Sequence, residues 1–72
     1  MDAKQCQMAR AGLGISGREL ARLAGVGYAT LARFESGAQI APESAQKIAA
    51  ALEAAGSTFS RRAGRLGVTV PE

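Results

Sequence analysis

The stretch LAGVGYATLARFESG, residues Leu23–Gly37, decides the fold of this chain. It holds two glycines, Gly25 and Gly27, between two segments whose apolar residues recur at helical spacing. Two short helices joined by a three- or four-residue turn that contains glycine form a helix-turn-helix. The sequence therefore predicts such a unit, with its turn at Gly25–Gly27.

The motif requires three residue types, and the sequence supplies all of them. A small residue is needed where the two helices touch, and Ala21 stands there. Gly25 can adopt the positive φ that ends the first helix, and Leu31 is a branched apolar anchor for the second. Apolar residues occupy the supporting positions Leu20, Ala24, Val26 and Phe34.

Capping signals and glycines predict two helices before the turn. Asp2 with Gln5 is a variant of the capping box, and Ser16 with Glu19 is a cleaner one. We expect Gly12 and Gly14 to close the first helix and Gly25 to stop the second. The expected apolar stripes are Cys6, Ala9 and Leu13 in the first helix, and Leu20, Leu23 and Ala24 in the second.

Two more helices and a hairpin are predicted after the turn. The third helix begins at Gly27 or Tyr28 and ends at Ser36-Gly37, and Pro42 suits the first turn of a fourth that runs to Gly56. The fourth has the strongest periodicity, carried by Ala45, Ile48, Ala49, Leu52 and Ala55.

The residues after Gly56 change in character. Segments 57–60 and 67–70 are short, alternating and β-branched, which predicts a two-stranded hairpin around a basic loop, Arg61–Leu66. A frayed tail is the alternative. We therefore divide the chain into residues 1–56, a helix-turn-helix domain, and residues 57–72, an extension that is a candidate for dimerisation.

Composition limits the possible functions. The 72 residues carry nine Lys or Arg against six Asp or Glu, a net charge of +3, and the pI is about 9.8. A pI above about 9 is typical of nucleic-acid binders, although an ordinary basic surface has the same signature. Much of the apolar content is alanine, so the core must come from closely approaching helices with little room for a cofactor.

Cysteine and histidine usage points to a metal-free protein of a reducing compartment. Cys6 is the only cysteine and there is no histidine, so an internal disulfide and a zinc site are not expected. Neither a signal peptide nor an apolar stretch of about 20 residues is recognisable. These features favour a cytoplasmic protein without a membrane span.

The register of ISGRELARLAGVGYATLARFESG, with ARAGLG before it, resembles the Cro/repressor-like (XRE-type) helix-turn-helix family of phage and bacterial transcription regulators. The resemblance covers about Gln5 to Ala55. It implies an all-α fold, a small four-helix domain like that of lambda repressor, to which the hairpin is added. The tail STFSRRAGRLGVTV is similar to the short extension of small single-domain members.

The resemblance implies a sequence-specific regulator of transcription, such as a repressor, that inserts the helix at about residues 28–36 into the major groove of double-stranded DNA. With Leu31 and Phe34 turned inward, the 100° helical step turns other residues outward as base readers. These are Tyr28, Ala29, Thr30 and Arg33. The expected phosphate contacts are Gly17, Arg18, Ser36 and Gln39.

Two positions depart from the family pattern, and two charged residues are expected to pair. Gly17 stands where the family commonly has glutamine, and Gly27 where it usually has a polar residue; both weaken the expected grip on DNA. Family members with Arg and Glu at positions 10 and 35 pair them, so we expect a structural ion pair between Arg10 and Glu35. The second basic cluster, Arg61, Arg62 and Arg65, either contacts DNA outside the core site or is solvated.

Two function classes remain open. In the first, the chain is a regulator that binds a two-fold operator, with half-sites about 10 bp apart, as a homodimer formed through the fourth helix and the hairpin. In the second, the same fold is a protein-interaction module such as an antitoxin or adaptor. An enzyme is not expected, because histidine is absent and Cys6 lies on a buried stripe.

Overall fold

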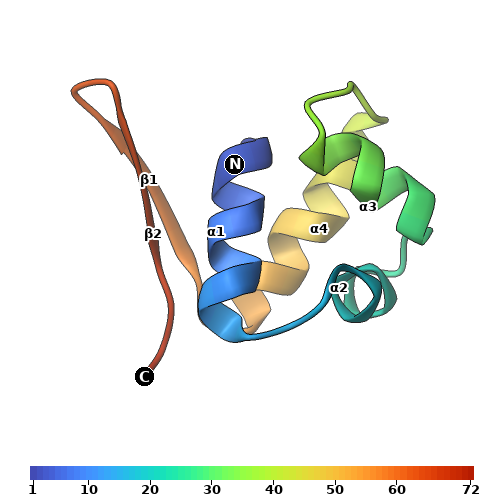
Figure 1. Cartoon of the computed structure of the whole chain (residues 1–72), viewed down its shortest axis with the longest axis horizontal. Coiled ribbons are helices and arrows are strands. Elements are labelled where there is room, and N and C mark those ends of the chain that lie inside the picture. The colour runs from blue at the N-terminus through green and yellow to red at the C-terminus, as the bar shows by residue number, and fades with distance from the viewer.

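The computed structural model describes all residues, 1–72, as four helices followed by a two-stranded antiparallel hairpin. Figure 1 shows the hairpin on one side of α1, with α2 and α3 toward the opposite end of the long axis. The predicted fold class is confirmed. In chain order the elements are α1 (Ala3–Leu13), α2 (Gly17–Ala24), α3 (Tyr28–Glu35), α4 (Pro42–Ala54), β1 (Thr58–Arg62) and β2 (Arg65–Thr69).

The helix ends follow the capping signals. Asp2 and Gln5 form a complete capping box at α1, and the Ser16 hydroxyl accepts a hydrogen bond from the Glu19 amide at α2. Gly14 and Gly25 end these helices in the left-handed conformation, each with φ of 71°. No element exceeds the 13 residues of α4, and none combines the length and hydropathy that a bilayer span requires.

Gly12 does not close α1 as predicted but lies inside it. A Cβ atom at Gly12 would come within 2.9 Å of Cγ1 of Val70, which follows β2. The glycine therefore allows the end of the hairpin to approach the helix closely.

The core lies where the four helices meet. Its fully buried residues are contributed by every helix: Cys6, Ala9, Leu20, Ala21, Leu31, Ile48 and Leu52. Leu23 is not part of this stripe, since it is 50% exposed. The inner face of α2 is centred on Leu20, Ala21 and Ala24, and the helical step carries Leu23 to its margin beside Ala51 and Ala54.

The hairpin is longer, and its turn is tighter, than the sequence predicted. The strands pair from Thr58 with Thr69 to Arg62 with Arg65, so the predicted loop Arg61–Leu66 is wrong. Only Ala63 and Gly64 lie in the turn, with φ values of 52° and 75°. Two positive φ values are typical of the two-residue turns that match the twist of paired strands. The turn is hard to recognise in the sequence because the strand residues next to it are arginines, which do not continue the alternation of β-branched residues.

Side chains of α1 hold the hairpin against the helices. The Gln5 Nε2 atom donates to the carbonyl oxygens of Ser60 at 2.8 Å and Gly67 at 3.3 Å. Arg61 forms an ion pair with Asp2 at 3.1 Å. Phe59 and Val68, which face each other across the strands, pack against the helical core. The segment after Gly56 is therefore a docked hairpin rather than a frayed tail.

Candidate nucleic-acid interface

The outer face of α3 presents the residues expected to read bases. Leu31 is 1% exposed and anchors the helix inward, together with the partly buried Phe34. The opposite side carries exposed Ala29 and Arg33. The two ion pairs of the chain join other residues, so the guanidinium of Arg33 is free to bind a base edge.

The remaining two predicted readers lie at the flanks of this face. Thr30 is partly buried, whereas Tyr28 is 45% exposed. The ring of Tyr28 lies beside the start of α2, where the guanidinium carbon of Arg18 sits 4.5 Å from the ring centroid. An arginine over an aromatic face is held by cation–π attraction. This stack therefore links the first turn of α2 to the start of α3.

Gly17 makes room for the tyrosine. A Cβ atom at Gly17 would lie 3.1 Å from Cε1 of Tyr28 and 3.8 Å from Cδ2 of Leu31. The first amides of α2 can bind an anion at this helix N-terminus, and the Tyr28 ring and Arg18 side chain border them. Sequence reasoning missed this arrangement. Its signal was the coincidence of a glycine at position 17 with a large aromatic at position 28.

An ion pair locks α1 to the end of α3. Nε and Nη2 of Arg10 each lie 3.0 Å from a carboxylate oxygen of Glu35. The two side chains are 28% and 14% exposed. The hydrogen bond to Glu35 raises the pKa of Arg10 above its usual value. Gln7 adds a bond from Nε2 to the Glu35 carbonyl oxygen at 2.7 Å, so both the side chain and the backbone of Glu35 are held by α1.

Comparison with protein families agrees with this geometry. The helix-turn-helix family profile matches residues 7–55, which covers α2, the turn, α3 and α4 completely and most of α1. The chain belongs to the XRE-type helix-turn-helix family. It therefore has a DNA-binding helix-turn-helix domain, and the family is one of DNA-binding domains rather than of enzymes. No curated protein matches the chain significantly.

Within this helix-turn-helix, replacing Gly17 by alanine should weaken DNA binding several-fold without unfolding the domain. The new Cβ pushes the ring of Tyr28 aside and disturbs its stack with Arg18, while alanine suits the helix better than glycine. Gly27→Ala is the matched control, because a Cβ there meets only the Thr30 hydroxyl, at 3.9 Å. Equal affinities of the two variants in a fluorescence anisotropy titration would contradict the role given to the stack.

The two phosphate contacts expected after α3 differ in availability. Ser36 ends the helix, and its hydroxyl donates to the Arg33 carbonyl oxygen at 2.8 Å. The hydroxyl proton of Ser36 is therefore already engaged at the C-terminal end of α3. Gln39 lies exposed in the segment between α3 and α4, and its side chain takes part in none of the hydrogen bonds within the chain. Gln39 is therefore the more available donor to a phosphate.

Cys6 is buried against the same ion pair. Its Sγ lies 3.3 Å from Oε2 of Glu35, and burial, reinforced by this carboxylate, raises the pKa of the thiol to about 12. Because the thiolate is the reactive form, the folded chain keeps this cysteine inert at neutral pH.

The raised pKa predicts a loss of stability in alkali. Between the ordinary thiol pKa of 9.0 and the folded value of about 12, the unfolded chain holds fewer protons than the folded one. The free energy of unfolding therefore falls as pH rises through this window, by up to about 1.4 kcal/mol per pH unit. Urea unfolding of the wild type and of Cys6→Ala from pH 8 to 11 measures this slope. A wild-type slope no steeper than that of the variant would contradict it.

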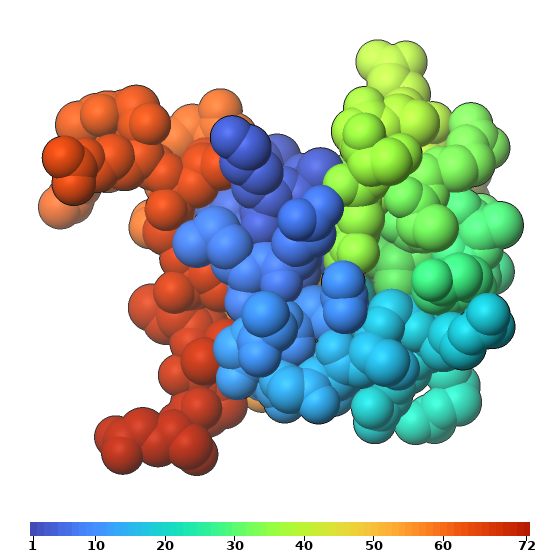
Figure 2. All heavy atoms as spheres, viewed as in Figure 1, coloured from blue at the N-terminus to red at the C-terminus, as the bar shows by residue number.

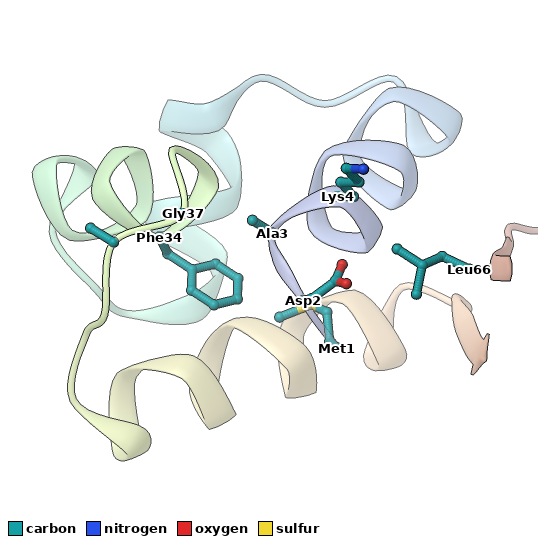
Figure 3. A pocket seen from close by; sticks show the side chains of 8 residues that line it. Met1, Asp2, Ala3, Lys4, Phe34, Gly37 and Leu66 are labelled. Atoms are coloured by element: carbon teal, nitrogen blue, oxygen red, sulfur yellow. The ribbon is translucent and has the colours of Figure 1, made fainter. Parts of the chain in front are cut away.

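One hollow lies at the C-terminal end of the reading helix, where that helix faces α1 and the hairpin. It has a volume of about 470 Å³ and lies between the start of α1, Phe34 and Leu66 of β2 (Figure 3). Its ionisable side chains are Asp2 and Lys4. The Asp2 carboxylate is occupied by the Gln5 amide and by Arg61, so the hollow offers no free acid paired with a nucleophile. The structure also brings together no group of three or more potential metal ligands.

Proposed function

We propose that this chain is a sequence-specific regulator of transcription that reads double-stranded DNA by inserting α3 into the major groove. The observation that carries the proposal is the outer face of α3, where Ala29 and the unpaired Arg33 stand exposed over a helix anchored by Leu31. Arginine binds guanine O6 and N7 with two hydrogen bonds, and alanine can contact a thymine methyl group.

The surroundings of α3 supply contacts to the DNA backbone. The backbone amides of Gly17 and Arg18 lie at the start of α2, beside the Tyr28 ring. Gln39 lies exposed after the C-terminal end of α3. Such contacts set the position of the protein on the duplex, whereas the base contacts select the sequence. Thr30, at the partly buried flank, contributes at the margin of the reading face.

The regulator acts as a homodimer on a two-fold operator. A single small domain buries little surface on DNA, and specific affinity usually requires two half-sites, whose centres lie about 10 bp or a multiple apart. The surface assigned to dimerisation is the hairpin with the neighbouring part of α4. The hairpin lies at the opposite end of the molecule from α3, so pairing there leaves the reading face free (Figure 1).

Selection of bound duplexes from random DNA tests this function. The purified chain should enrich a motif with two related half-sites, and its affinity should fall steeply with salt, because several phosphates are neutralised. Recovery of sequences no different from the starting pool would remove the proposal.

The second candidate is a protein-interaction module, an antitoxin or adaptor, built on the same fold. Gly17 and Gly27 favour it, because they replace side chains that relatives place toward DNA. A chain that enriches no DNA motif, and whose Arg33→Ala variant binds genomic fragments as the wild type does, would favour this reading over the first.

A further inference from the structure

The free edge of β1 is an unpartnered surface. Because the turn has two residues, Arg62 and Arg65 form a hydrogen-bonded pair. Along the two strands, hydrogen-bonded pairs then alternate with pairs that share no backbone hydrogen bond. Phe59 and Arg61 fall in the non-bonded pairs. Their N–H and C=O groups point away from β2, toward solvent. A strand edge of this kind is a template for another strand.

A groove runs beside β1. It consists of two hollows of about 570 and 180 Å³, both lined by Met1 and Phe59 and neither by any residue of β2. Met1 is 38% exposed, and Ala49 adds a further apolar contact. Ser57, which is 3% exposed, lies at one end of the groove and its hydroxyl has no hydrogen-bond partner. The β1 side of the hairpin thus has apolar surface and a polar group that the chain leaves unsatisfied.

We propose that β1 pairs antiparallel with β1 of a second copy of this chain, so that two hairpins form one four-stranded sheet. The inference rests on the proposed homodimer and names its contact. A five-residue strand paired with its own copy overlaps completely only when its middle residue, Ser60, faces the second copy's Ser60. In this register Phe59 and Arg61 exchange backbone hydrogen bonds with Arg61 and Phe59 of the other copy.

Charge supports this register. The strand carries both of its arginines at one end, and the antiparallel arrangement sets Arg61 across from Phe59 and Arg62 across from Thr58. Like charges directly opposite each other are destabilising, and a shift by one residue toward the turn would set Arg61 against itself. The second copy's Arg62 also comes beside Thr58, which shares its hollow with Glu53. The second copy's turn comes beside Ser57.

The sheet so formed leaves the DNA-binding face free. The hairpin projects from the side of α1, whereas α3 lies at the other end of the molecule, as the space-filling view shows (Figure 2). Both copies therefore keep their reading helices exposed. The second copy covers Met1 and Phe59, which line the groove in the single chain.

Disulfide trapping tests the register directly. Ser60→Cys should form a crosslinked dimer on mild oxidation, because facing residues of a non-bonded pair lie within disulfide distance. Thr58→Cys is the matched control on the same face of the strand, and its two copies would lie about 13 Å apart. We expect crosslinking of Ser60→Cys to be at least about tenfold faster than that of Thr58→Cys, and none in the wild type, whose Cys6 is buried. Equal rates would overturn the register.

A second pair of variants tests the backbone contacts. Arg61→Pro removes an outward N–H and keeps the hairpin pairs, whereas Arg61→Ala keeps the N–H and removes only the side chain. Two lost hydrogen bonds per dimer should raise the dimer dissociation constant at least about tenfold in Arg61→Pro relative to Arg61→Ala, measured by sedimentation. Equal constants, or a strictly monomeric wild type at high micromolar concentration, would overturn the pairing.

DNA selection distinguishes failure of the pairing from failure of the proposed function. A monomer that still enriches a single half-site overturns the pairing alone, whereas a trapped dimer that enriches no DNA overturns the proposed function alone.

Discussion

Replacing Glu35 by alanine should lower the melting temperature of this domain by roughly 10 to 30 °C. The substitution leaves the Arg10 guanidinium without its carboxylate and removes the acceptor that lies 3.3 Å from Cys6. Removing one partner of a fully buried pair costs about 3 to 5 kcal/mol. Because Arg10 retains 28% of its side-chain exposure, we expect about 2 to 4 kcal/mol here.

This loss is large for a chain of 72 residues, whose total stability is on the order of 4 to 11 kcal/mol. Glu35→Gln is the matched control, since it keeps the volume and one acceptor and should cost less than the alanine substitution. Thermal unfolding followed by circular dichroism gives both values. A melting temperature of Glu35→Ala within a few degrees of the wild type would contradict the structural role of the pair.

The second large effect concerns DNA binding. Arg33→Ala should reduce affinity for the selected operator about 10- to 100-fold, because a bidentate arginine–guanine contact discriminates by about 1 to 3 kcal/mol. The exposed side chain carries no structural ion pair, so the melting temperature should stay near that of the wild type. The preference for one base pair in each half-site should also relax.

Arg65→Ala is the control for loss of charge alone. Arg65 is exposed and pairs with Arg62 next to the turn of the hairpin. The hairpin lies at the other end of the molecule from α3 (Figure 1), so removal of this side chain should change affinity little and leave the base preference intact. Equal losses in the two variants, with the motif unchanged, would mean that Arg33 contacts phosphate rather than a base.

Local signals predicted the helices well. The caps at Asp2 and Ser16, the glycines at 14 and 25, and Pro42 each act within one turn of the chain, so the sequence alone reveals them. Long-range contacts were harder to foresee. The contact between Gly12 and Val70 and the hydrogen bonds from Gln5 to the hairpin join residues more than 50 positions apart, and neither leaves a local pattern.

The candidate site divides in the same way. The inward anchors of α3 follow from helical periodicity, which is why Ala29 and Arg33 were expected on its outer face. The packing of Tyr28 over Gly17 depends on the angle between α2 and α3, which periodicity does not encode. The arginine-flanked turn at Ala63-Gly64 was missed because alanine seldom adopts positive φ.

The most direct test of the central claim is a map of the surface that DNA covers. Backbone amide shifts, recorded by NMR as the selected duplex is added to the labelled chain, identify that surface residue by residue. We expect the largest changes at the start of α2 and along α3, at Gly17, Arg18, Tyr28, Ala29 and Arg33. Changes that gather on the hairpin while α3 stays unaffected would contradict this claim.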